Sequence, residues 1–133
     1  EKLILMGCYG IGVGRLMGAI VEISNDANGI IWTEAVAPYK VHLISLKGKE
    51  GKSSQLAGNL YGKMIKNGIE VLFDDRDDLR AGEKFADADL IGIPYRVIVS
   101  EKTAEIESAE IKKRDGAKSE VLPIGDIIKR INH

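Results

Sequence analysis

Cysteine is scarce in this sequence, with one residue, Cys8, in 133. A single cysteine cannot close an internal disulfide, so the sequence gives no sign of a disulfide-stapled secreted domain. Long apolar runs are missing as well, since none approaches the roughly 18 residues that a membrane-spanning helix needs. An excess of positive charge is also missing, because the formal net charge is −1. We therefore expect a cytoplasmic protein without a membrane partner, and any nucleic acid must be held by a local patch.

The N-terminal part of the chain reads as a strand, a glycine-rich turn and a helix. Residues Lys2–Met6 form an apolar run that predicts a short buried strand. A stripe of apolar residues predicts an amphipathic helix from about Val13 to Ala27, and Asn28-Gly29 is expected to cap and end it. Because the chain starts with Glu1 rather than Met, directly before an apolar run, we expect a piece of a longer protein. Its residues 1–30 should pack less well than residues 40–133.

The remainder of the chain alternates between strand and helix patterns. We assign residues 1–32 to the end of one domain, residues 33–39 to a linker and residues 40–133 to a second domain. The expected strands of the second domain are 40–46, 69–73, 95–100, 109–114 and 119–122, and the expected helices are 53–66, 83–91 and 124–131. Alternating strands and helices followed by a hairpin predict an α/β fold. We expect a mixed five-stranded sheet flanked by three helices.

The glycine cluster near the N-terminus invites a nucleotide-binding interpretation. A Walker loop needs Lys and Ser or Thr after its last glycine, and here Val13 and Gly14 follow Gly12. A dinucleotide fingerprint fails as well, because its third glycine is misplaced. Arg15 lies in the first turn of the expected helix, where a guanidinium can clamp an anionic group. The alternative is a glycine-rich joint with a solvated arginine.

The run GCYGIGVGRLMGAIVE resembles motif 3 of class II aminoacyl-tRNA synthetases, in the form typical of prolyl-tRNA synthetases. It departs from that form at Gly14, where serine is usual. The resemblance implies that Arg15 and Gly12 bind ATP, and that Cys8 and Gly10 form the floor of the amino-acid pocket. For Cys8 the alternative role is that of a small buried apolar residue.

A second run, GIEVLFDDRDDLRAGEKFADADLIGIPYRVIV, resembles the anticodon-binding domain of the same synthetases. The resemblance implies that five residues contact the tRNA anticodon: Phe85, Asp89, Arg96, Lys102 and Lys118. Their chemistry fits such a role, because single-stranded bases are stacked on aromatic rings and hydrogen-bonded along their edges. A carboxylate accepts from guanine N1 and N2, and an arginine can donate to guanine O6 and N7. The alternatives are a core contact for Phe85 and solvated surface charges for the lysines.

Metal binding is not indicated by the acidic residues or the histidines. In residues 74–80 acids are interleaved with two arginines, a pattern that favours local ion pairs. His42 has no second histidine or cysteine at ligand spacing. We expect no metal site.

The predicted function is tRNA anticodon recognition by the C-terminal part of a homodimeric ligase that joins proline to tRNA(Pro) with ATP. We expect no DNA partner and no catalysis by this chain alone. Three alternatives stay open: the equivalent domain of a threonyl, histidyl or glycyl synthetase, a non-catalytic paralogue, and a nucleotide-binding α/β domain.

Overall fold

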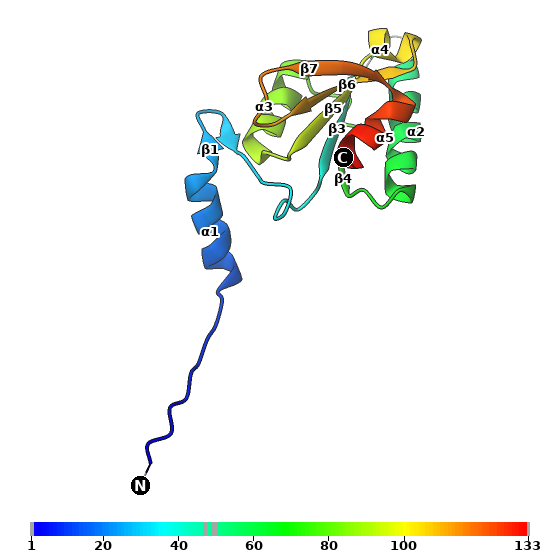
Figure 1. The fold of residues 1–133 in the computed structure, drawn as a ribbon. Helices are drawn as coiled ribbons and strands as arrows, with labels where there is room; N and C mark the ends of the chain where they lie inside the picture. The colour runs from blue at the N-terminus through cyan, green and yellow to red at the C-terminus, as the bar shows by residue number, and fades with distance from the viewer. Residues whose placement is uncertain (1, 47, 49–50, 133) are drawn as a thin grey trace.

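A computed structural model describes residues 2–46, 48 and 51–132, which leaves residues 1, 47, 49–50 and 133 outside the described residues. Its centre is a five-stranded sheet in the order β4-β3-β5-β6-β7 (Figure 1). The strands are β3 (Val41–Ser45), β4 (Val71–Asp74), β5 (Tyr95–Val99), β6 (Ser108–Lys113) and β7 (Ser119–Pro123). β3 pairs in parallel with β4 and β5, whereas β5-β6 and β6-β7 are antiparallel. The predicted α/β fold with a mixed sheet is confirmed.

Helices cover both faces of this sheet. They are α2 (Lys52–Lys66), α3 (Ala81–Ile91), α4 (Glu101–Glu105) and α5 (Ile124–Asn132). α2 and α5 lie on one face and α3 lies on the other (Figure 1). The prediction of three helices missed α4, whose five residues are too few to show a helical period. Ser100 is its N-cap residue, and the Ser100 hydroxyl accepts a hydrogen bond from the Thr103 amide at 3.3 Å.

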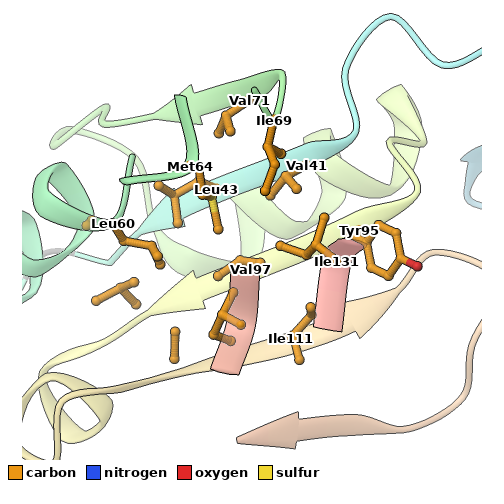
Figure 2. Packing of buried hydrophobic residues seen from close by; sticks show 14 of the residues in the cluster. Val41, Leu43, Leu60, Met64, Ile69, Val71, Tyr95, Val97, Ile111 and Ile131 are labelled. Carbon is orange, nitrogen blue, oxygen red and sulfur yellow. The ribbon is translucent and has the colours of Figure 1, made fainter. Parts of the chain in front are cut away.

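The hydrophobic core lies between the sheet and the helices α2 and α5 (Figure 2). Side chains alternate along a strand, so Val41 and Leu43 enter this core while His42 between them faces α3. Leu60 and Met64, one helical turn apart on α2, are fully buried against these strands. The apolar stripe predicted for this helix is confirmed, and it fixes the face that α2 presents to the sheet.

The helix expected near the N-terminus is shorter than predicted. α1 spans Val13–Ile23 and is followed by a two-stranded hairpin, β1 (Asn25–Asp26) and β2 (Gly29–Ile30). Ala27 and Asn28 form the turn of this hairpin and Gly29 begins β2, so Asn28-Gly29 does not cap the helix. Gly29 has a φ of 150°, a conformation that side chains disfavour. The hairpin packs closely against α3, so closely that a Cβ at Gly29 would collide with the backbone of Leu90.

The strand predicted for residues 2–6 is wrong. These residues have no regular structure, and Leu3 and Leu5 are each 98% exposed. A strand needs a neighbour to receive its hydrogen bonds, and no strand in the described part of the chain pairs with this segment. The segment and α1 extend away from the sheet (Figure 1), and α1 has no buried residue. The prediction that the N-terminal part packs less well is confirmed. None of the described helices has the length and apolar character needed to cross a membrane.

Candidate nucleic-acid interface

Phe85, Asp89 and Arg96 form one cluster on the α3 side of the sheet. Phe85 and Asp89 lie four residues apart on α3, so they share a face of that helix. The chain then turns at Gly92, whose φ of 78° ends α3, and returns along β5 with Arg96 facing the helix. Arg96 Nη1 donates to Asp89 Oδ1 at 2.9 Å, and the Arg96 guanidinium carbon lies 5.2 Å from the centroid of the Phe85 ring.

The cluster offers an aromatic face, an acceptor and donors within a small area. The Arg96 side chain is 14% exposed and that of Asp89 is 34% exposed, so the carboxylate is the more accessible of the two. Arg96 Nε is buried and has no hydrogen-bond partner among the described residues. An unpaired buried donor is costly. Arg96 Nη1, in contrast, is paired with Asp89. This ion pair offsets part of the cost of burying the charge and holds the planar guanidinium in a fixed orientation.

Arg114 supports this cluster from the other side, and the sequence pattern did not point to it. Its Nε donates to the backbone oxygen of Asp89 at 3.1 Å. Its Nη1 and Nη2 donate to the two carboxylate oxygens of Asp26 at 2.8 and 2.7 Å. Hydrogen bonding from Arg114 is the main reason that the pKa of Asp26 lies below its usual range. No sequence signal joins two residues 88 positions apart, so only the fold identifies this pair.

Lys102 and Lys118 are not brought to the cluster. Lys102 lies on α4, beyond the carboxyl end of β5. Lys118 lies in the loop between β6 and β7, at the other end of β5. It lines a cavity of about 370 Å³ with Tyr95 and Arg130, on the α5 side of the sheet, whereas Arg96 faces α3. Both lysines are exposed.

The residues predicted to bind ATP and the amino acid lie in the N-terminal segment. Cys8, Gly10 and Gly12 are exposed and precede α1, for which Gly12 is the N-cap. Arg15 is exposed in the first turn of α1. In the described part of the chain all four residues are exposed, so this segment alone does not bury them in a pocket.

The acidic run after β4 forms ion pairs, as predicted. Arg76 Nε and Nη2 donate to the two carboxylate oxygens of Asp74 at 2.9 and 2.7 Å, and Nη2 also reaches Asp87 at 2.9 Å. The hydrogen bonds from Arg76 lower the pKa of Asp74 to about 2. On the other side of Asp74 lies Lys84, which is 1% exposed and donates to the Ser45 carbonyl oxygen at 2.7 Å. These contacts tie α3 to the carboxyl ends of β3 and β4.

The anticodon binding domain family matches residues 40–133. This chain belongs to that family. The anticodon-binding domain thus coincides with the five-stranded sheet and its four helices, α2 to α5, and the cluster of Phe85, Asp89 and Arg96 lies within it.

Relatives of this anticodon-binding domain are also similar in the N-terminal segment. The chain is 51% identical over 127 residues to a proline–tRNA ligase of Persephonella marina, which covers 96% of this chain and 22% of that protein. It is 48% identical over 129 residues to a proline–tRNA ligase of Staphylococcus saprophyticus, covering 97% and 22%. It is 44% identical over 133 residues to one of Thermoanaerobacter pseudethanolicus, covering 100% and 23%. The chain therefore spans about a fifth of the length of these relatives.

Proposed function

We propose that this chain recognises the anticodon of tRNA(Pro) as part of a cytoplasmic, homodimeric proline–tRNA ligase. The observation that carries the proposal is the contact between Arg96, Asp89 and Phe85 inside a domain of the anticodon-binding family. The names of the relatives favour the prolyl enzyme over the threonyl, histidyl and glycyl alternatives. Residues 1–32 are proposed to be the end of the catalytic domain, and residues 33–39 the linker.

In this proposal the cluster reads bases by their edges. Asp89 is the accessible acceptor for guanine N1 and N2, and Arg96 donates to O6 and N7. The Phe85 ring has one face beside the Arg96 guanidinium, so a base would stack on the ring from the opposite side. Lys102 and Lys118 lie apart from the cluster and would contact phosphates, which adds affinity but little sequence information.

The parent ligase would use ATP to activate proline before transferring it to tRNA. Arg15 and Gly12 would then bind ATP, and Cys8 and Gly10 would border the proline. All four are exposed in this chain, so a working site needs other parts of the ligase around them. An electrostatically preorganised site requires several groups held together at once.

The experiment compares wild type and Arg96→Ala in the full-length ligase, using tRNAs altered at each anticodon base in turn. We expect Arg96→Ala to cost about 1–3 kcal/mol in transition-state stabilisation with the cognate tRNA and to relax selectivity at one base. Lys129→Ala is the matched control, because it removes a positive charge from an exposed position on α5. An equal loss on every tRNA would reject base reading and leave Arg96 as a structural or phosphate-binding residue.

A further inference from the structure

One buried arginine joins the N-terminal hairpin to the sheet beside the candidate base-reading residues. The Arg114 side chain is 8% exposed. Two of its nitrogens hold both oxygens of Asp26, on the hairpin, and the third donates to the backbone of Asp89. A bidentate arginine–carboxylate pair fixes both distance and angle. All three nitrogens of one guanidinium are therefore engaged in holding the hairpin to the end of α3.

The backbones around this pair also fit closely. The amide of Trp32 donates to the Gly92 carbonyl oxygen at 3.0 Å. A Cβ at Gly92 would collide with the Ile30 carbonyl oxygen, and a Cβ at Gly29 would collide with Leu90. Neither glycine can be replaced without moving the hairpin away from α3. The joint between the hairpin and α3 is thus a close contact of two backbones as well as of side chains.

The joint and the candidate base-reading cluster share Asp89. Its Oδ1 lies 2.9 Å from Arg96 Nη1 and 4.0 Å from Arg114 Nε. A base that accepts from Arg96, or that donates to Asp89, alters the field and the position of this carboxylate. Such a change would alter the electrostatic attraction between Asp89 and Arg114, and Arg114 is also bound to Asp26. Three ion pairs, Arg96–Asp89, Asp89–Arg114 and Arg114–Asp26, therefore form a continuous connection from the cluster to the hairpin.

We propose that Asp26 and Arg114 are positioning residues that latch the β1-β2 hairpin against α3 and couple base binding at Arg96 to the placement of the N-terminal segment. This inference rests on the proposed function, in which that segment is the end of the catalytic domain. Coupling between two sites is reciprocal and corresponds to about a 5- to 150-fold effect on binding in typical proteins. Without the Asp26–Arg114 pair, a correct anticodon should no longer raise the rate of aminoacylation. The rate of proline activation should stay unchanged.

Asp26→Asn is the sharpest variant. Asp26 Oδ1 also accepts from the amides of Asn28 and Gly29 at 2.8 and 3.0 Å, and asparagine keeps that oxygen. The turn of the hairpin should survive while the charge that holds Arg114 is lost. Arg114→Lys is a second variant, which keeps a positive charge but loses the fork that binds both oxygens. Asp26→Glu retains the carboxylate and should rescue most of the effect.

The experiment measures proline-dependent ATP–pyrophosphate exchange and aminoacylation by the full-length ligase, with cognate and anticodon-altered tRNA(Pro). For Asp26→Asn and Arg114→Lys we expect unchanged exchange, about a 5- to 150-fold lower kcat/KM with the cognate tRNA, and a smaller loss with altered tRNAs. Asp126→Asn, which breaks an exposed pair with Lys129 on α5, is the control and should change neither assay.

Three results would overturn the latch. Equal losses on cognate and altered tRNAs would make Asp26 and Arg114 structural residues only, and no loss would show that the joint needs no ion pair. A fall in exchange equal to the fall in aminoacylation would place the defect in proline activation. Failure of the wild-type ligase to charge tRNA(Pro) is a separate result, because it would reject the proposed function and the latch together.

Discussion

Leu5 and Leu43 lie in two apolar runs of similar length and have opposite surroundings. Leu5 is 98% exposed, in a segment without regular structure, whereas Leu43 is 0% exposed at the centre of the sheet. The difference is not in the residues themselves, because both runs favour a strand. β3 has a hydrogen-bonded neighbour on each side and a helix above each face. An apolar run becomes a strand only where other parts of the fold supply those partners.

The largest expected effect concerns the chemistry of the N-terminal region. The 133-residue chain should form no prolyl-adenylate, because Arg15 and Cys8 are exposed and no other active-site group surrounds them among the described residues. The measurement is proline-dependent ATP–pyrophosphate exchange, with a full-length relative as the positive control. Exchange above background by this chain would mean that residues 1–32 contain a complete site.

Leucine-to-alanine substitutions test the comparison directly. Leu43→Ala should lower the free energy of unfolding by roughly 2–5 kcal/mol, because it removes buried contacts and leaves a cavity in the core. Leu5→Ala should leave it unchanged, since the side chain is already exposed to water. Chemical denaturation of the two variants and the wild type is the measurement. A clear destabilisation by Leu5→Ala would mean that the N-terminal segment packs on the domain in solution.

His42 provides a pH-dependent effect within the well-packed region. It is 3% exposed, and burial lowers its pKa below the ordinary 6.5. The folded state therefore binds this proton less readily than the unfolded state, so stability is full above pH 6.5 and falls as the pH drops below it. One proton's difference corresponds to about 1.4 kcal/mol per pH unit.

Thermal unfolding of wild type and His42→Gln between pH 7.5 and 5 measures this effect. The difference in slope between the two proteins isolates His42 from the carboxylates, most of which titrate at lower pH. The pKa of Asp74, at about 2, adds a loss of stability only when the pH falls below about 4. Parallel curves for the two proteins would show that His42 keeps the same proton affinity when the chain unfolds.

The smallest expected effect is at the surface of the same domain. Lys129 donates to Asp126 at 2.9 Å, and their side chains are 74% and 51% exposed. Exposed ion pairs contribute little because water and salt screen them. Lys129→Ala should therefore leave the melting temperature within experimental error. A marked fall would mean that membership of the packed domain, rather than burial, decides which contacts stabilise the chain.

Local patterns were sufficient for most of the domain. The strands β3 to β7 and the helices α2, α3 and α5 were predicted within a few residues of their observed bounds, because apolar patterns mark most of them and glycine, proline or serine marks many of their ends. The meeting of Phe85, Asp89 and Arg96 was also predictable. Two of them are a helical turn apart, and the turn at Gly92 and Pro94 returns the third alongside.

Local sequence patterns did not predict the elements that depend on contacts with distant parts of the chain. The sequence of residues 2–6 has the composition of a strand but carries no information on whether a neighbouring strand is present. α4 and the β1-β2 hairpin are too short for a period to appear. The resemblance assigned Lys118 to the anticodon contacts, but in the structure it lies in the loop between β6 and β7, beside Tyr95 and Arg130 and apart from the cluster.

The sequence alone determined the fold class, the order of the main elements and the family resemblance, since these depend on local periodicity and on short motifs. Only the tertiary structure decided that Asp26 meets Arg114, that Asp89 lies between two arginines, and that Lys84 is buried beside Asp74. The physical reason is that ion pairs and hydrogen bonds require their atoms to lie within about 3 Å to 4 Å. Residues far apart in the chain reach that distance only after the sheet and its helices have packed.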